Sequence, residues 1–406
     1  MSYRHKMAMK KVLYISGSLG LGHITRDLAI ARELRKQNPE VWITWLAAHP
    51  ANVVLKEAGE NLLPEPDVWA DETVVAENAA RGFHLGLMKY AFEIRKVWAQ
   101  HLEVFKRIIQ RKEFDLVIGD ETYEIDVVLK NRSLVIDIPF VMIYDFIGVD
   151  AMTKNPLERL GVYINNRKWA EGYKSVPYPV DLLLFVGELE DVADKKFGFL
   201  LPNRREWAKA VCKFVGYILQ FDPREYTDKA KVRSKLGYGE EPLVVCSIGG
   251  TSIGKEILEL CAQAYPIIRE KIPDLRMILV CGPRLPVESV IVPPGIEVRG
   301  YVPALYEHFA ASNLAIVQGG GTTTNELTAL RRPFLYFPIE GHFGQEIGGV
   351  EKLARHQAGV KMTYSQTTPQ SLAEKVISNI GKKVTYKPIP TDGAQKAAQL
   401  INELLL

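Results

Sequence analysis

The sequence predicts an α/β fold made of two doubly wound domains that face each other across a cleft. Short apolar runs rich in β-branched residues alternate with amphipathic segments along most of the chain, and this alternation is typical of parallel sheets covered by helices. The order strand, Gly-rich turn, helix occurs at residues 11–37 and starts again at residues 243–271. The restart indicates a second domain of the same type, and a cleft between two such domains is a common place for a substrate.

Length and composition limit the class of protein. A chain of 406 residues that is 47% hydrophobic and 24% charged fits two globular domains better than one ordinary core. The net charge of +3 and the pI near 8.4 are too mild to indicate nucleic-acid binding, and the sequence has no long Lys/Arg run. We therefore expect no nucleic-acid partner.

Cysteine spacing and hydropathy indicate the compartment. The cysteines form no CxxC pair, which favours buried thiols in a reducing compartment over metal ligands or disulfides. No segment has the apolar length of a membrane span, and residues 1–11 lack the apolar core of a secretion signal. We expect a cytoplasmic protein with four free thiols. These are Cys212, Cys246, Cys261 and Cys281.

The first half of the chain alternates predicted strands and helices. Apolar, β-branched runs predict strands at residues 11–16, 42–47, 114–119, 140–143, 182–186 and 213–215. Helical spacing predicts helices at residues 27–37, 49–59 and 83–111, and residues 68–78 are predicted as a loop.

The predicted helix at residues 83–111 carries apolar residues near one face and many basic residues elsewhere. Such a helix can lie on an anionic membrane surface. A helix that packs on the core with one solvated face is the interpretation that we favour.

A Gly-rich loop follows the first strand. Gly17, Gly20 and Gly22 have the spacing G-x-x-G-x-G, which differs from the dinucleotide-binding fingerprint. His23 stands at the helix entry, where it could act as a general base with a pKa near working pH. A histidine that only caps or packs the helix is the alternative.

Asp120 comes directly after the strand predicted at residues 114–119, and catalytic carboxylates favour this end of a parallel strand. Asp120 could accept the N–H of His23 and stabilise the imidazolium. A solvated or helix-capping aspartate is the alternative.

The pattern breaks at residues 216–226, where a non-periodic segment precedes a charged helix. We therefore expect an N-terminal domain at residues 1–216, a C-terminal domain at residues 217–385 and a closing helix within residues 386–406 that could pack back on the first domain. Further strands are predicted at residues 243–248, 276–280, 296–299, 314–317 and 333–337, and helices at residues 228–236, 255–271, 304–311, 322–330, 371–380 and 393–405.

The most informative stretch is the turn Gly319-Gly320-Gly321 between the strand at 314–317 and the helix at 322–330. Glycines let the backbone approach a ligand, and the free N–H groups of the helix start, together with threonine hydroxyls, could hold a phosphate without any lysine. An ordinary strand-to-helix turn is the alternative.

Polar groups follow this turn in an informative order. Glu326 lies one turn inside the helix, where a carboxylate could accept hydrogen bonds from a ribose diol. The loop after the next strand carries His342, Gln345 and Glu346, which suit sugar hydroxyls. A nucleoside diphosphate-sugar would need these three kinds of contact in this order.

From Lys11 onward the chain resembles the GT-B inverting nucleotide-sugar glycosyltransferases, namely glycosyltransferase family 28, which is related to MurG, and the UDP-glycosyltransferases of plants and antibiotic producers. Gly20, Gly22 and His23 are similar to the first Gly-rich loop of that family, and His23 to its plant-type catalytic base. The resemblance implies two Rossmann-like domains, with the acceptor on the first domain and the donor on the second.

The resemblance also implies roles on the donor side. The loop at residues 249–251 resembles the one that touches the donor phosphates, and the backbone after Gly300 resembles the segment that holds the base. The residues expected to bind the donor, from the chemistry and the resemblance together, are Gly249, Gly250, Thr251, Tyr301, Val302, Gly320, Gly321, Thr322, Thr323, Glu326, His342 and Gln345.

Three positions depart from the family pattern. Gln318 or Gly319 stands where the plant-type sequence has histidine, Gly344 replaces the acid before Gln345, and Gly348-Gly349 replaces Asn-Ala. These differences bear on the identity of the donor sugar and not on the diphosphate site.

The implied activity is inverting transfer of a sugar from a nucleoside diphosphate-sugar, expected to be a UDP-sugar, to a hydroxyl group. His23, oriented by Asp120, would act as the base, with no metal ion and no cofactor other than the donor co-substrate. A nucleotide-sugar epimerase or hydrolase on the same fold, and a non-catalytic nucleotide-sugar-binding subunit, remain alternatives. The acceptor could be a small molecule or lipid-linked, with peripheral association at the inner face of the membrane, and the sequence does not predict the oligomeric state.

Overall fold

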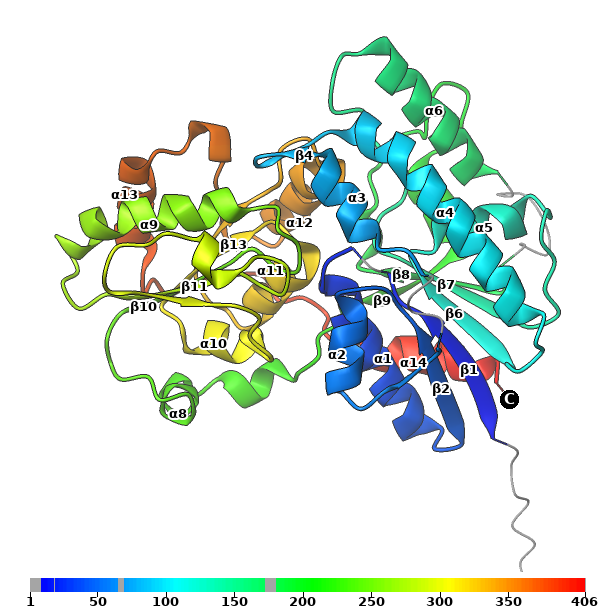
Figure 1. The fold of residues 1–406 in the computed structure, drawn as a ribbon, viewed down its shortest axis with the longest axis horizontal. Coiled ribbons are helices and arrows are strands. Elements are labelled where there is room, and N and C mark those ends of the chain that lie inside the picture. The colour runs from blue at the N-terminus through cyan, green and yellow to red at the C-terminus, as the bar shows by residue number, and fades with distance from the viewer. Residues whose placement is uncertain (1–8, 18, 65–68, 172–179, 406) are drawn as a thin grey trace, which may run out of the picture.

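The structure, a computed structural model, describes residues 9–17, 19–64, 69–171 and 180–405. It contains two α/β domains side by side, with the first half of the chain in one and the second half in the other (Figure 1). The first sheet has seven strands in the order β3-β2-β1-β6-β7-β8-β9, and the second has six in the order β12-β11-β10-β13-β14-β15. Neighbouring strands in both sheets are parallel. The predicted fold of two Rossmann-like domains is therefore confirmed.

The N-terminal sheet is covered by helices on both faces. Its strands are β1 (Lys10–Ile15), β2 (Val41–Leu46), β3 (Asn61–Leu62), β6 (Leu116–Asp120), β7 (Phe140–Tyr144), β8 (Leu182–Val186) and β9 (Cys212–Gly216). Its helices are α1 (Gly22–Gln37), α2 (Ala51–Glu57), α3 (Glu72–Ala79), α4 (Leu87–Ile109), α5 (Tyr123–Lys130), α6 (Pro156–Ala170) and α7 (Arg204–Val211).

The C-terminal domain repeats this plan. Its strands are β10 (Leu243–Ser247), β11 (Arg276–Val280), β12 (Ile296–Arg299), β13 (Leu314–Gln318), β14 (Phe334–Phe337) and β15 (Val360–Lys361). Its helices are α8 (Lys229–Lys235), α9 (Lys255–Arg269), α10 (Leu305–Ala311), α11 (Gly321–Ala329), α12 (Val350–Arg355) and α13 (Pro369–Asn379).

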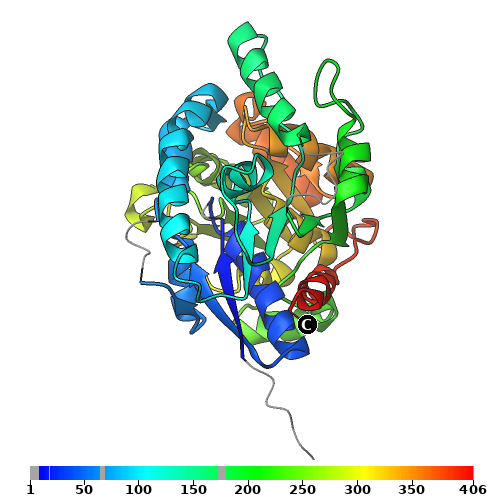
Figure 2. The ribbon, with the colours of Figure 1, turned by 90° about the vertical axis from the view of Figure 1, so that its right-hand side faces the viewer.

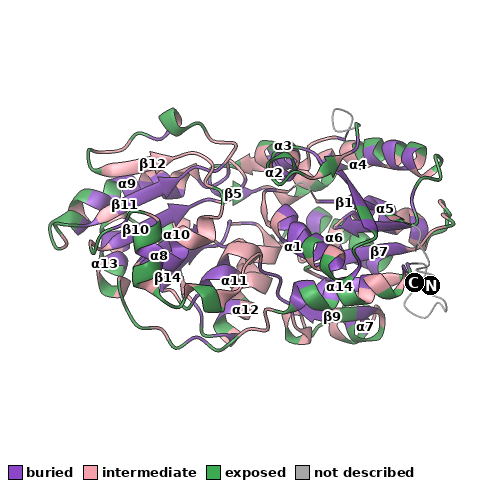
Figure 3. Ribbon diagram, turned by 90° about the horizontal axis from the view of Figure 1, so that it is seen from below, coloured by how far each residue is buried: buried purple, intermediate pink, exposed green. Residues whose placement is uncertain are grey.

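The first strand shows why these sequences form central parallel strands. Leu13 and Ile15 pack into the core on one face of the sheet, and Val12 and Tyr14 pack into the core on the other face. Because both faces are covered, the strand needs a continuous apolar run in place of an alternating one. Figure 3 shows this burial along the strands of both sheets.

Strand order places two sites at equivalent points of the two sheets. In each sheet the order reverses beside the first strand, between β1 and β6 and between β10 and β13. Ligands of open α/β sheets bind at such points, outside the carboxyl ends of the strands. We therefore expect ligands at the loops after β1, β6, β10 and β13.

The last helix, α14 (Gly393–Glu403), packs against α1 of the N-terminal domain. Ala397, Ala398 and Ile401 lie in the same core as β1, and Nδ2 of Asn38 donates to Oδ1 of Asn402 over 2.9 Å. Figure 2 shows the two helices together near the C-terminus. The chain thus crosses between the domains twice.

Residues 68–78 were predicted as a loop, and that prediction is wrong for most of the segment, although Val68 lies outside the described residues. Helix α3 begins after Asp71, whose side chain accepts from the backbone N–H of Thr73. The helix leads into a hairpin of β4 (Ala80–Arg81) and β5 (His84–Leu85). Its apolar residues Ala76 and Ala79 pack into the core of the other domain, which a local pattern does not reveal.

Two further sequence predictions are confirmed. All four cysteines are free and buried. Helix α4 packs into the N-terminal core through Ile94, Val104, Phe105 and Ile108, as a core-packing helix with one solvated face should. None of the described helices combines the length and the hydropathy that a membrane span requires.

Candidate functional site

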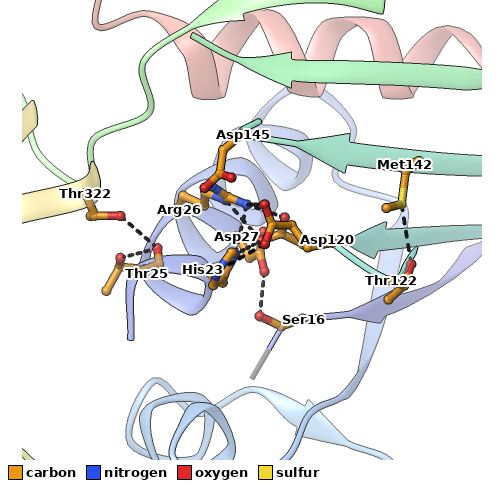
Figure 4. Close-up of polar contacts among 12 residues, drawn as sticks. Ser16, His23, Thr25, Arg26, Asp27, Asp120, Thr122, Met142, Asp145 and Thr322 are labelled. Atoms are coloured by element: carbon orange, nitrogen blue, oxygen red, sulfur yellow. Dashed lines mark hydrogen bonds and ion pairs between the residues drawn. The ribbon is translucent and has the colours of Figure 1, made fainter. Parts of the chain in front are cut away.

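His23 and Asp120 meet at the switch point of the N-terminal sheet. His23 lies in the first turn of α1, and Asp120 ends β6, the neighbour of β1. Nδ1 of His23 lies 3.0 Å from Oδ2 of Asp120. His23 is 9% exposed and Asp120 is fully buried. Figure 4 shows the two side chains facing each other.

Arg26, which the sequence analysis did not identify, holds Asp120 from one turn further along α1. Its Nε and Nη2 lie 3.0 and 2.5 Å from the two oxygens of Asp120. Burial alone would raise the pKa of Asp120, but Arg26 and His23 outweigh burial and hold that pKa below its usual value. Asp120 is therefore an anion at neutral pH, as an orienting group for an imidazolium must be.

A pair of carboxyl groups, Glu121 and Asp145, lies on the other side of His23. Oε2 of Glu121 is 3.5 Å from Nε2 of His23, and Nη1 of Arg26 donates to Asp145 over 2.7 Å. Burial and the neighbouring Asp145 raise the pKa of Glu121 well above its usual value. Partial desolvation opposes ionisation of Asp145, whose side chain is 37% exposed, but Arg26 and the hydrogen bond from Glu121 lower its pKa. Glu121 is thus a protonated acid that donates to ionised Asp145.

Glu121 also shows backbone strain. Its φ is 53°, in the left-handed region that side chains other than glycine rarely adopt. Its Oε1 is buried without a hydrogen-bond partner. Nη2 of Arg26 lies 4.0 Å from this oxygen, and the other oxygen, Oε2, is the one that faces Nε2 of His23.

The switch point of the C-terminal sheet carries the Gly-rich turn. Gly320 precedes α11, and no atom lies within 4 Å of the position that a Cβ at Gly320 would take. The space beside the backbone is therefore open at the residue that caps α11, and the free N–H groups of a helix start suit an anion. Thr322 Oγ1 donates to the carbonyl oxygen of Gly22 over 3.3 Å, so this turn touches the His23 loop.

Lys352 on α12 extends toward the start of α11, and the sequence analysis missed it. Its Nζ lies 3.8 Å from the Cβ position of Gly321 and donates to Oδ1 of Asn325 over 2.9 Å. Burial lowers its pKa, while Asp191 and Asp145 act in the opposite direction. The positive potential at the start of α11 is therefore increased by an ammonium group. Lys352 belongs to no sequence motif that would indicate this role.

The loop after β10 closes against the loop after β1. A Cβ at Gly250 would lie 2.4 Å from the backbone nitrogen of Leu21, so only glycine permits this approach. Thr251 Cγ2 lies 3.6 Å from the Cβ position of Gly20. Gly249 has a φ of 81°, which also requires glycine. The structure thus brings the predicted loops of the two domains into direct contact.

Glu326 lies inside α11 and is almost completely buried. Burial raises its pKa to about 8, and a hydrogen bond with Gln220 only partly opposes this. At neutral pH the group is therefore mostly protonated before any ligand binds. Two hydroxyl donors of a ribose would favour its ionised form.

The remaining predicted donor residues lie around the same edge. Tyr301 and Val302 follow β12, and Tyr301 is partly buried. His342 follows β14, and burial lowers its pKa. Gln345 Oε1 accepts from the backbone N–H of Ile339 over 3.0 Å and lies 3.3 Å from the Cβ position of Gly319. Gln345 belongs to a π-helical turn, Gly344–Gly349, a feature that is frequent at functional sites.

Among the residues that the structure describes, two groups of side chains have the composition of metal ligands. Their ligand atoms lie within 4.8 Å of one another, and the groups are His23, Glu121 and Asp145, and Glu72, His101 and Glu124. Sequence spacing does not reveal either group because each comes from distant segments. In the first group Asp145 already pairs with Arg26, and in the second Nδ1 of His101 lies 3.0 Å from Glu124, so each group is also satisfied by internal contacts.

Known proteins resemble this chain in sequence and in fold. Residues 244–404 match the glycosyltransferase family 28 C-terminal domain. The chain is 23% identical to UDP-N-acetylglucosamine--N-acetylmuramyl-(pentapeptide) pyrophosphoryl-undecaprenol N-acetylglucosamine transferase of Clostridioides difficile (strain 630). The match extends over 386 residues and covers 92% of this chain and 82% of the relative.

Two solved structures share the fold at low sequence identity. MurG of Acinetobacter baumannii has a TM-score of 0.53 at 15% identity, over 97% of this chain and 99% of that chain. The glycosyltransferase of kitacinnamycin has a TM-score of 0.59 at 15% identity, over 98% of this chain and all (100%) of that chain.

Proposed function

We propose that this chain, a MurG-like nucleotide-sugar glycosyltransferase with the GT-B fold, transfers a sugar, with inversion, from a UDP-sugar to a hydroxyl group. One observation supports this most strongly. The His23–Asp120 pair and the open start of α11 lie at the switch points of the two sheets, and Thr322 and Gly22 join the two loops. A base and an anion site on opposite sides of one gap suit displacement of a diphosphate.

His23 acts as the general base in this proposal. Asp120 and Arg26 both reach Nδ1 of His23, but only donation of Nδ1–H to Asp120 leaves Nε2 of the neutral ring unprotonated. Nε2 then takes the proton of the acceptor hydroxyl as its oxygen attacks the anomeric carbon. The bond from that carbon to the diphosphate oxygen breaks, and the nucleoside diphosphate leaves with the electron pair. Asp120 stabilises the imidazolium that forms.

The leaving diphosphate is stabilised by groups that are already in place. In this proposal the diphosphate lies between the N–H groups at the start of α11 and the ammonium of Lys352, whose Nζ is 3.8 Å from the Cβ position of Gly321. Fixed donors of this kind contribute strongly to catalysis because they need no reorganisation during the reaction. We propose that transfer needs no metal ion, so activity after treatment with EDTA should be unchanged.

The proposal that the donor carries uridine depends on the C-terminal domain, which is expected to bind the donor. The Clostridioides difficile relative uses UDP-N-acetylglucosamine, as its name states. In this chain Glu326 would accept from the ribose diol, and the backbone at Tyr301 and Val302 would hold the base. The sugar itself would meet His342 and Gln345 beside the π-helical turn.

We propose further that the acceptor is held at a membrane surface. Large apolar side chains are exposed on α6 and on a neighbouring loop. The hydroxyl of Tyr163 on α6 donates to the carbonyl oxygen of Phe199 in this loop. Leu160, Phe199 and Leu200 are 55%, 79% and 83% exposed. Exposed apolar side chains are unusually dense here for a surface that faces water. Leu160→Glu should lower binding to anionic vesicles, whereas Val53→Glu on α2 should not. Equal binding by both variants would contradict this placement.

Turnover by the purified chain tests the activity. UDP-sugars should stabilise the wild type and His23→Ala alike in thermal-shift measurements, because the base contributes to turnover and little to donor binding. Transfer should fall by about 10²–10⁴-fold in His23→Ala. Loss of donor binding in this variant would contradict the role of His23, and rapid release of UDP without acceptor would favour a hydrolase.

A further inference from the structure

A basic pocket lies on the C-terminal domain, far along α11 from the Gly-rich turn. It has a volume of about 480 Å³ and is lined by the residues that precede β13 and β14, together with the start of α8 and the segment after α13. The donor turn follows the carboxyl end of β13, whereas this pocket opens at the amino ends of the strands. The two sites therefore lie at opposite edges of the sheet.

The charge of this pocket has one sign. Five of the residues that line it are cationic, and none of its described lining residues carries a carboxylate. Within the described part of the chain no ion pair involves any of the five. They are Lys229, Arg331, Arg332, Lys382 and Lys383.

Helix ends account for part of this cluster. Arg331 and Arg332 follow the carboxyl end of α11, where cations are favourable, and they donate to the carbonyl oxygens of Tyr386 and Ala310 over 3.1 and 2.7 Å. Lys382 and Lys383 similarly follow α13. Lys229 differs because it is the first residue of α8, where the helix dipole disfavours a cation.

Lys229 therefore indicates an uncompensated positive potential. It is partly buried, and no hydrogen bond to its side chain is found among the described residues. Burial, Arg332 and Arg233 together lower its pKa to about 8. A charge that is desolvated beside other cations destabilises the protein unless an anion joins it.

We propose that this pocket is a second anion site that binds a soluble, phosphate-bearing molecule of about the size of pyrophosphate. Arginine guanidinium groups match phosphate oxygens in pairs, and lysines add mobile point charges. The volume is within the range of small-ligand pockets and exceeds what a single chloride ion needs. The inference does not depend on the proposed glycosyl transfer, because none of the five residues belongs to the donor site.

Calorimetric titration with sodium pyrophosphate at constant ionic strength tests this site. The wild type should show two classes of binding, one at the start of α11 and one in the pocket. The double variant Lys229→Gln/Lys382→Gln should lose one class, with affinity at that site lower by about tenfold or more. UDP should displace the class that remains. The double variant should still fold, because neither lysine forms an ion pair with a described residue, and Lys382 makes only a 3.4 Å contact with Oδ1 of Asn379.

A control separates the pocket from general charge. Lys271→Gln/Lys375→Gln removes the same charge from exposed positions of the same domain and should keep both classes. An unchanged isotherm in the pocket variant would overturn the proposal, as would equal loss in the control. Pocket-dependent binding to phosphatidic acid vesicles without any binding of pyrophosphate would identify a lipid headgroup and overturn the soluble ligand.

Discussion

At the scale of single residues, the site is organised by the charges around His23. Asp120 and Asp145 are anions and Arg26 is the cation between them, while Glu121 keeps its proton. With neutral His23 these groups carry one net negative charge. This negative charge lies beside the ring of His23, where the proposed transfer develops positive charge.

The role of Lys352 can be tested by comparing UDP with uridine. Lys352→Gln removes an ammonium beside Gly321, so the affinity for UDP should fall about tenfold while that for uridine stays unchanged. Calorimetry with both ligands measures this difference, and Lys375→Gln on the exposed face of α13 is the control. Equal losses for UDP and uridine would show that Lys352 supports the fold and not the diphosphate.

Glu326 should make donor binding depend on pH. Its pKa of about 8 in the free protein means that it is mostly protonated at pH 7, and ribose hydroxyls that donate to the carboxylate would lower that pKa. Affinity for uridine should therefore rise as pH increases from 6 to 8 and level off above. Calorimetry should find no such rise in Glu326→Gln. A rise of the same size in this variant would assign it to another group.

At the scale of elements, the contact between the two Gly-rich loops sets the distance between base and donor. Gly250→Ala would place a methyl group 2.4 Å from the nitrogen of Leu21, so the loops must separate. We expect kcat/KM to fall by about 10²-fold, because displacements near 1 Å have such effects. Gly161→Ala, where no atom lies within 4 Å of the new methyl group, is the control and should keep full activity.

Small-angle scattering gives a second test of this contact. Gly250→Ala should have a larger radius of gyration than the wild type, because the domains must move apart. Normal activity and normal dimensions would show that the loop rearranges locally and that the contact does not set the geometry.

The central strands and long helices could be predicted because each carries its own periodic signal. The strand predicted at residues 314–317 and the helix predicted at residues 322–330 are β13 and α11 in the structure, and each end differs by no more than one residue. Helix α3 could not be predicted in this way. It is short, and the apolar residues that define its face, Ala76 and Ala79, pack against the other domain.

At the scale of the whole molecule, the two domains share more than the loops of the site. Arg284 of the second domain pairs with Asp71, which caps α3, and with Glu77 inside α3, at 2.7 and 2.9 Å. The backbone N–H of Leu85 in the hairpin donates to the carbonyl oxygen of Glu340 over 2.8 Å. Closure of the site therefore also involves a segment that is distant from both predicted loops.

The same long-range packing explains what the sequence could not reveal about the site. His23 and Asp120 could be predicted as partners because each follows a strand at the same edge of the sheet. Asp145 and Lys352 belong to no local motif, and only the folded chain brings them to Arg26 and Gly321. Arg26 lies one turn after His23 on α1, outside the helix predicted at residues 27–37. The family resemblance read from the glycine turns is confirmed, while the individual donor contacts stay predictions.

The central claim is that the start of α11 and Lys352 hold the diphosphate of the donor opposite His23. A crystal structure with UDP tests it most directly. We predict phosphate oxygens within hydrogen-bond distance of the backbone N–H groups at the first turn of α11 and of Lys352 Nζ, with the ribose at Glu326. A diphosphate bound elsewhere, or an α11 start covered by packed side chains, would contradict the account.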